Sequence, residues 1–231
     1  MDKAKLIKAL GVLSGASVLL LVARFIVFGD LEFWYLTWNL LLAALPLLFV
    51  WLLLQRLRTS SWVSWQNAAL TLLWLGFLPN SFYLVTDFIH LAEVSSSTIV
   101  FDAVMMMTFT LTGLLLGFAS ILPLHRLLRI RLVPATADGL IAIVFALCSF
   151  AIYLGRYMRW NTWDILVNPA GLLFNVSDSL VNPRTGGEAW STTLLFFAYI
   201  SVLYIAIIQF VPIRVDSSKL TSGKKTLKKV K

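Results

Sequence analysis

Long apolar runs, separated by short polar stretches, dominate the order of residues along the chain. A helix that crosses the hydrocarbon core of a bilayer needs about 20 mostly apolar residues. Six stretches meet or approach that length: Leu6–Phe28, Tyr35–Leu54, Trp62–Leu78, Ile99–Leu122, Gly139–Leu154 and Thr192–Pro212. A membrane β-barrel would show short alternating segments instead of unbroken apolar runs. The pattern predicts an all-α, polytopic membrane helix bundle of about six transmembrane helices.

Two stretches between these runs are too polar to cross a bilayer. One follows the third run, where Pro79-Asn80-Ser81 is typical of a helix end. The other follows the fifth run, from about Arg156 to Pro169. We expect each of them to form an interfacial or re-entrant segment on the outer side of the membrane.

Composition agrees with a membrane protein and excludes other classes. Hydrophobic residues make up 59% of the 231 residues, and charged residues only 13%, about half the usual share in soluble domains. A water-soluble enzyme or nucleic-acid-binding domain is excluded, and so is a disordered chain, which would be poor in aromatic residues. The single cysteine, Cys148, permits no internal disulfide, and two histidines permit no zinc-finger cluster.

The net charge of +8 is explained by membrane orientation without nucleic acid. If the N-terminus is cytoplasmic, fifteen of the 19 Lys and Arg residues fall on the inner side, and eight of the 11 acids fall on the outer side. We therefore expect a multi-pass protein of the cell membrane with both termini in the cytoplasm. Residues 1–213 would form the six-span domain, and 214–231 a disordered basic tail that attracts anionic lipids of the bilayer. The sequence identifies no protein partner.

Polar side chains gather at the predicted outer end of the bundle. Asp87, His90 and Glu93 stand at i, i+3 and i+6, which places them on roughly one face of a helix. Asp102 follows near the outer start of the fourth span, where an acid should face protein or water and not lipid. Asn39 lies about one turn inside the second span.

The stretch after the fifth span adds cations and aromatic rings to the same side. Arg156 and Arg159 are one helical turn apart, as are Trp160 and Trp163. Tryptophan is common at membrane interfaces, but arginine on the outer side departs from the positive-inside rule and needs an explanation. Asp164 lies in the same run.

Two of these stretches resemble the signatures of a known family. Leu78 to Leu91 is similar to the pattern LPN-x-x-Y-x-x-T-D-x-x-H-L of the bacterial membrane family catalogued as domain of unknown function 1361, and Tyr153 to Leu166 resembles its second signature. Asn39-Leu40-Leu41-Leu42-Ala43 looks like its N-L-x-L-A segment. Ser81-Phe82 stands where we expect Ala-Pro. The resemblance implies a multi-pass inner-membrane protein and implies no reaction.

The outer polar residues admit three hypotheses. In the first, Asp87, Asp102 and Asp164 form helix-locking ion pairs with Arg156, Arg159 and Arg24 in a structural or accessory protein. In the second, an outward-facing site binds or acts on a lipid-linked or phosphorylated substrate, with arginine holding phosphate. In the third, the protein transports a small solute or ion, along a path lined by residues such as Gly113 and Gly117.

The second hypothesis assigns specific roles. The candidate catalytic residues are Asp87, His90, Arg156, Arg159 and Asp164, with His90 as a general base oriented by Asp87. The candidate substrate-binding residues are Asn39, Asn80, Trp160, Asn161 and Trp163. A divalent metal ion held by Asp87, His90 and Asp102 would supply an activated water.

Overall fold

The computed structural model describes residues 3–181 and 183–211 of the chain. Its elements in chain order are α1 (Lys3–Phe28), α2 (Tyr35–Arg56), α3 (Trp65–Tyr83), the 3₁₀ helix η1 (Leu84–Glu93), α4 (Ile99–Arg131), α5 (Pro134–Tyr157), α6 (Asp164–Val167), α7 (Pro169–Val181) and α8 (Pro183–Phe210). The two described ranges contain no strand, which confirms the all-α prediction for them. The expected basic tail at 214–231 lies outside the described residues.

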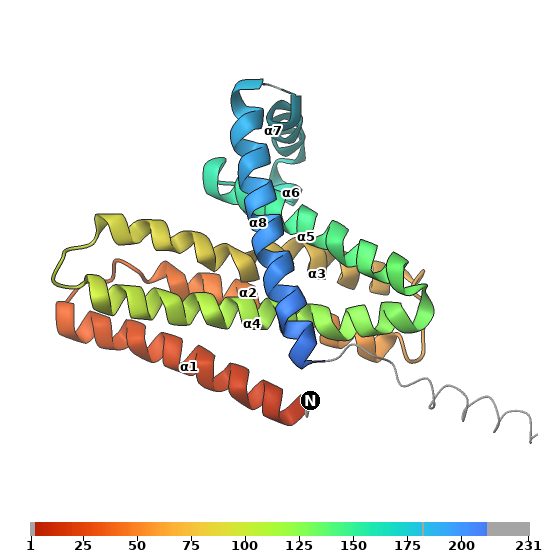
Figure 1. Ribbon diagram of the computed structural model, residues 1–231, viewed down its shortest axis with the longest axis horizontal. Coiled ribbons are helices and arrows are strands. Elements are labelled where there is room, and N and C mark those ends of the chain that lie inside the picture. Colours follow the sequence, from red (N-terminus) through yellow and green to blue (C-terminus); the bar gives the residue numbers. More distant parts are fainter. Residues whose placement is uncertain (1–2, 182, 212–231) are drawn as a thin grey trace, which may run out of the picture.

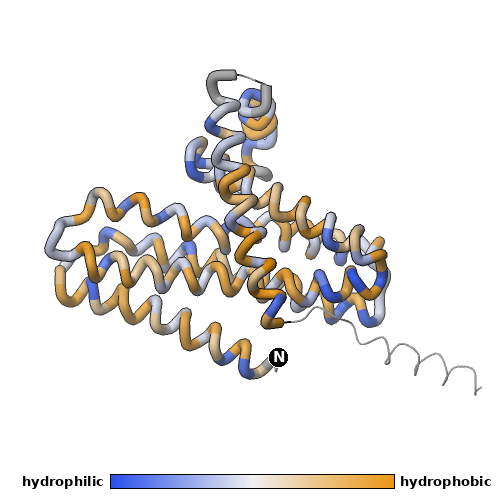
Figure 2. The backbone as a smooth tube through the Cα atoms, viewed as in Figure 1, coloured by the Kyte–Doolittle hydropathy of each residue, from blue (hydrophilic) through white to orange (hydrophobic). Residues whose placement is uncertain are grey.

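Six helical stretches are long and apolar enough to cross a membrane. They cover Ala4–Phe28, Tyr35–Arg56, Trp65–Ala92, Ile99–Arg131, Pro134–Tyr157 and Gly186–Phe210. Large apolar side chains remain exposed on them, and both Leu19 and Leu72 are 69% exposed. Such exposure is costly in water and favourable in hydrocarbon. Hydrophilic residues concentrate near helix ends and around α6 and α7 (Figure 2). These features are those of a multi-pass membrane protein, as the sequence predicts.

Five of the long helices share one direction, and the sixth crosses them. Figure 1 shows α1 to α5 lying along the long axis of the molecule, with α8 running steeply across this direction. α8 packs on α5 and on α7, and the first part of α8 projects with α6 and α7 beyond the other helices. The sequence pattern predicts an apolar span at Thr192–Pro212, but neither the start of α8 at Pro183 nor its orientation.

α4 is the central helix of the bundle. It contacts α1, α2, α3, η1 and α5, and its buried residues run from Asp102 to His125. At 33 residues it extends about 50 Å, because an α-helix rises 1.5 Å per residue. A helix that is apolar on all sides is expected to be surrounded by other elements. α4 therefore supports α1, α2, α3, η1 and α5.

The third span does not end at Leu78, which corrects the sequence-based expectation. α3 continues through Pro79 to Tyr83, and η1 then prolongs it to Glu93. Hydroxyl groups of buried side chains bond to neighbouring carbonyls here: Ser81 Oγ donates to Ala43 O on α2 at 2.9 Å, and Thr110 Oγ1 donates to Leu84 O at 3.0 Å. These contacts anchor the helix on both sides of its change from α to 3₁₀. The stretch after the third span is thus an extension of the same helix.

Two glycines on α4 allow this extension to pack closely. A Cβ at Gly113 would lie 2.5 Å from Leu84 Cδ1 and 2.7 Å from Ser81 O, and a Cβ at Gly117 would lie 2.9 Å from Ser81 Cβ. Glycines four residues apart on one helix face permit close approach of a neighbouring helix. Gly113 and Gly117 therefore pack against α3 and η1, and are not positioned as the lining of an open path.

Arg24 fixes the end of α1 against α4. Its Nε donates to Asp102 Oδ1 at 2.5 Å, its Nη2 lies 3.3 Å from Glu32 Oε2, and its Nη1 donates to Asp30. Arg24 and Asp102 are both buried, and the ring of Phe33 lies 4.4 Å from the guanidinium carbon. The hydrogen bond from Arg24 lowers the pKa of the exposed Asp30 carboxyl. For Asp102, the ion-pair hypothesis is therefore correct.

A second polar network joins the C-terminal end of α4 and the N-terminal end of α5 to α8. His125 bonds through Nδ1 to Tyr204 Oη and through Nε2 to Asp138 Oδ1, each at 2.7 Å. Arg129 donates to both oxygens of Asp138, at 2.7 and 2.5 Å. The sequence pattern did not single out this network, because its residues come from three separate helices, α4, α5 and α8, whose packing the pattern does not give.

Candidate functional site

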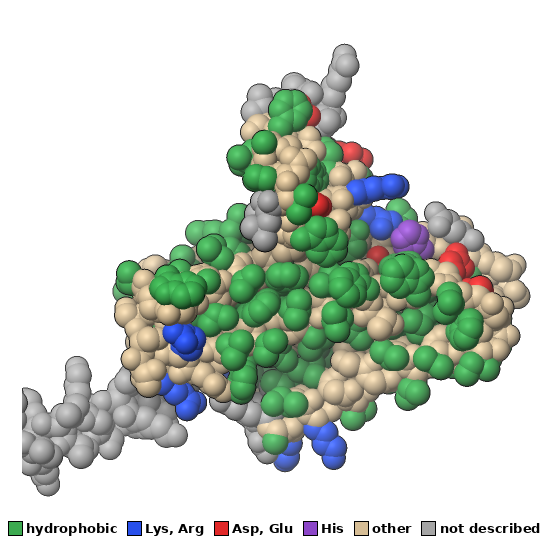
Figure 3. All heavy atoms as spheres, turned by 180° about the vertical axis from the view of Figure 1, so that it is seen from behind, with side chains coloured by type: hydrophobic (Ala, Val, Ile, Leu, Met, Phe, Trp, Pro, Cys, Tyr) green, Lys and Arg blue, Asp and Glu red, His purple; other side chains and the backbone are tan. Residues whose placement is uncertain are grey.

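A cavity of about 460 Å³ lies between α2, α3, η1, the end of α5 and the turn that follows α5. Its walls combine residues of the two stretches that resemble family signatures, Leu78–Leu91 and Tyr153–Leu166, with residues from the first turns of α2. Figure 3 shows basic, acidic and histidine side chains gathered where the part with α7 projects, on a face that is otherwise mostly apolar. The volume is in the range of small-molecule pockets. Stretches of chain about 80 residues apart thus form one site.

Asp87 is the buried acid of this pocket. It is 2% exposed, and the side-chain amide of Asn39 on α2 donates to its Oδ2 at 3.3 Å. Because η1 is a 3₁₀ helix with three residues per turn, residues 87 and 90 lie one above the other on the same face. His90 therefore lines the pocket beside Asp87, and its ring meets that of Tyr35 edge to face at 5.7 Å.

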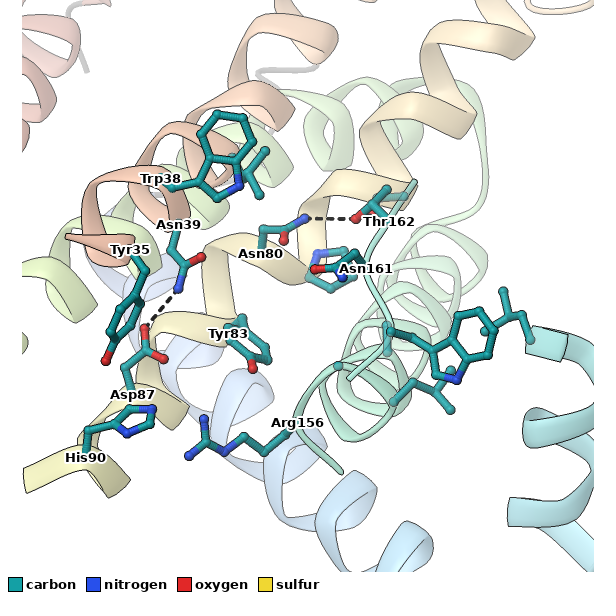
Figure 4. Close-up of a pocket in the computed structure, with 18 residues that line it drawn as sticks. Tyr35, Trp38, Asn39, Asn80, Tyr83, Asp87, His90, Arg156, Asn161 and Thr162 are labelled. Carbon is teal, nitrogen blue, oxygen red and sulfur yellow. Dashed lines mark hydrogen bonds between the residues drawn. The ribbon is translucent and has the colours of Figure 1, made fainter. Parts of the chain in front are cut away.

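Arg156 is the cation of the pocket. It extends from the last turn of α5 towards Asp87 and His90 (Figure 4). Among the described residues, Arg156 makes no hydrogen bond or salt bridge to a carboxylate, in contrast to Arg24 and Arg129. The ion-pair hypothesis therefore does not hold for Arg156 within the described part of the chain. Its guanidinium faces the cavity with donors available to an anion.

The opposite wall carries amide, hydroxyl and indole donors. Asn80 Nδ2 donates to Thr162 Oγ1 at 3.2 Å (Figure 4). Thr162 Oγ1 donates in turn to Gly76 O at 3.2 Å. Asn161 and Trp160 line the same wall. Trp160 Nε1 is buried and has no hydrogen-bond partner within the described residues. A buried N–H without a partner is costly, and a ligand acceptor would satisfy it.

Seven of the residues proposed from the sequence line this pocket: Asn39, Asn80, Asp87, His90, Arg156, Trp160 and Asn161. The others do not. Arg159 is exposed and has a positive φ of 57°, which turns the chain so that Trp160 N donates to Leu154 O at 3.2 Å. Asp164 accepts a hydrogen bond from Asn161 N at 2.6 Å and so closes a local turn, while Trp163 is 42% exposed.

The expected metal site does not form as predicted. Asp102 is bonded to Arg24 and does not line the pocket that contains Asp87 and His90. Within the described residues, no three His, Cys, Asp or Glu side chains are grouped so that they could hold a metal ion. Asp102 instead forms the ion pair with Arg24 that the first hypothesis allowed.

Three hydroxyl-bearing residues of the pocket were not proposed from the sequence: Tyr35, Tyr83 and Thr162. Tyr35 and Tyr83 line it, each one helical turn before a proposed residue, Asn39 and Asp87 respectively. Thr162 lies between Asn161 and Trp163 in the second stretch that resembles a family signature, Tyr153–Leu166. The spacing of four residues along a helix was the signal that could have indicated both tyrosines.

Comparison with known proteins identifies a family but no activity. The model of the family described as "Protein of unknown function (DUF1361)" matches residues 38–208, which include both stretches that form the pocket. No curated protein and no solved structure matches the chain.

Proposed function

We propose that this chain, which belongs to the DUF1361 family of membrane proteins, binds an amphiphilic ligand with a phosphate group in the pocket of Asp87, His90 and Arg156. The observation that carries the proposal is the guanidinium of Arg156, which faces a cavity without a described carboxylate partner. A guanidinium binds phosphate through two parallel hydrogen bonds and is a strong phosphate ligand in proteins.

The other walls suit the remainder of such a ligand. Leu42, Ala151, Leu154 and Leu172 supply apolar surface, and Trp38 and Trp160 supply aromatic surface. Asn161 and Trp160 supply donors for polar groups beyond the phosphate, and Asn80, whose amide nitrogen already donates to Phe77 O and Thr162 Oγ1, offers its side-chain oxygen as an acceptor. A lipid-linked phosphate combines these two chemistries in one molecule.

The contributions of the phosphate and of the apolar chain to binding can be measured separately with three ligands: farnesyl phosphate, farnesol and inorganic phosphate. With the purified protein in detergent, we expect farnesyl phosphate to bind at least about tenfold more tightly than either farnesol or inorganic phosphate, because it engages both kinds of wall. Equal affinity for farnesol and farnesyl phosphate would show that phosphate is not recognised and would contradict the proposal.

Asp87 and His90 are the candidate acid–base pair of this site. A histidine beside a carboxylate can accept a proton from water or donate one to a leaving oxygen. Release of inorganic phosphate from farnesyl phosphate by the wild type, lost in His90→Gln with binding retained, would assign hydrolysis to the site. Binding without phosphate release would assign a recognition role.

We also propose that the pocket opens on the outer side of the cell membrane and that both termini are cytoplasmic. In Figure 3 the acidic side chains lie at one end of the molecule, together with some of the Lys and Arg side chains, and the other Lys and Arg side chains lie away from that end. Cys148 is buried, so single cysteines introduced elsewhere report their own accessibility. Ser95→Cys should react with an impermeant maleimide from outside, and Ser61→Cys only from inside. Labelling of Ser222→Cys from outside would contradict a sixth crossing by α8.

A further inference from the structure

A second cavity lies at the other end of α2, far from the pocket of Asp87. It has a volume of about 550 Å³ and is formed by the last residues of α2, the turn after them and the last turns of α4. About 17 residues of helix separate Asn39 in the first pocket from Arg56 at the end of α2, which corresponds to roughly 25 Å. The two cavities are therefore separate sites.

The lining of this second cavity is basic on one side and apolar on the other. Its charged residues are Arg58, Arg126 and Arg131, and its apolar residues are Leu54, Leu57, Pro123, Leu127 and Ile130. No acidic residue is part of this lining. Three like charges around one recess repel each other, and an anion between them would offset that repulsion.

Neighbouring arginines have partners, whereas two in this cavity lack one. Arg129 is bonded to Asp138, and Arg56 Nε donates to Asn67 Oδ1 at 3.2 Å. In the described ranges, neither Arg58 nor Arg131 forms an ion pair or a side-chain hydrogen bond. Arg131 stacks over the ring of Trp62 at 5.9 Å, which orients the guanidinium without neutralising it.

We propose that this cavity binds the headgroup of an anionic phospholipid. The phosphodiester lies between Arg58 and Arg131, with Arg126 beside it, and an acyl chain follows the apolar wall of Leu54 and Leu127. The positive-inside rule explains why arginines are present at this end, but it does not explain why three of them line one recess with an apolar wall. Basic pockets between membrane helices are suited to anionic lipid headgroups. A free phosphate would use only half of the lining, so we assign the cavity to the lipid. The proposal is independent of the pocket around Asp87.

Thermal unfolding of the delipidated full-length protein in detergent tests the assignment. We expect phosphatidylglycerol to raise the Tm more than phosphatidylcholine with identical chains, and inorganic phosphate at equal concentration to have no effect. A Tm increase of equal size with phosphatidylcholine, or with inorganic phosphate, would overturn the proposal.

Matched variants test whether the rise in Tm with phosphatidylglycerol comes from binding in this cavity. Arg58→Gln/Arg131→Gln should weaken the response to phosphatidylglycerol about tenfold in concentration, because charge-assisted hydrogen bonds to phosphate are lost. Lys5→Gln/Lys8→Gln removes the same charge from exposed positions on α1 and should leave the response unchanged. Ile130→Trp, which fills the recess without changing charge, should act like the arginine variant. An equal loss in the lysine variant, or an unchanged response in both cavity variants, would refute the site.

Discussion

Asn80 on α3 donates a hydrogen bond to Thr162, 82 residues further along the chain, at 3.2 Å. This contact joins the two stretches that resemble the signatures of the family, one after the third apolar run and one after the fifth. The hydroxyl of Thr162 also donates to the carbonyl of Gly76, so the turn after α5 is fixed to α3 at two points. The pocket of Asp87, His90 and Arg156 lies beside this junction (Figure 4).

Thr162→Val should loosen this junction. The variant keeps the shape of the side chain and loses both hydrogen bonds, each worth about 1 kcal/mol. We expect faster hydrogen exchange at residues 160–164 and about fivefold weaker binding of farnesyl phosphate. Thr108→Val is the matched control, since the Thr108 hydroxyl donates only to Val104 O in its own helix. Unchanged exchange in the Thr162 variant would show that the junction does not hold the turn.

Gly113→Ala should displace η1 and destabilise the protein. The added Cβ would lie 2.5 Å from Leu84 Cδ1 and 2.7 Å from a backbone oxygen, so α4 and η1 would have to separate. Overpacking of this kind costs about 1–3 kcal/mol, and we expect a lower Tm together with weaker ligand binding.

Gly139→Ala is the control for that substitution. Its Cβ would meet nothing within 4 Å, and alanine favours a helix over glycine by about 1 kcal/mol. The Tm of this variant should be unchanged or higher. A similar Tm for both variants would contradict the close packing of α4 on η1.

Asp102→Asn should be strongly destabilising. It leaves the buried guanidinium of Arg24 without its charged partner on α4, and breaking a buried pair costs about 3–5 kcal/mol. Thermal unfolding of Arg24→Gln, Asp102→Asn and the double variant measures the coupling. We expect the double variant to lose much less than the sum of the two single losses. Additive losses would show that the two residues act separately.

Much of the fold follows from the length of apolar runs. Any backbone in hydrocarbon must satisfy its own hydrogen bonds, so an apolar run of about 20 residues has few alternatives to a helix. The same pattern predicted the end of α3 too early, because proline commonly ends a helix and Pro79 follows the apolar run. The helix continues beyond Pro79, where it packs against Gly113 and Gly117 on α4. The steep crossing of α8 likewise depends on its contacts with α5 and has no sequence signal.

The pocket was predictable in part, for a related reason. Charged and amide side chains avoid lipid, so Asp87, His90 and Arg156, each near the end of an apolar run, were expected to meet at one end of the bundle. Which of two neighbouring residues faces the pocket depends on local turns. Arg156 is still in α5, and its side chain lines the pocket. Arg159 follows the end of the helix with a left-handed backbone conformation, and the residue is exposed.

The most direct test of the proposed function compares these two arginines. Farnesyl phosphate binding is measured for wild type, Arg156→Gln and Arg159→Gln, two variants that remove the same charge three residues apart. We expect Arg156→Gln to weaken binding by about tenfold or more, and Arg159→Gln to stay within about twofold of wild type. Equal losses in both variants would show general attraction of an anion to a basic surface and would contradict a phosphate site in the pocket.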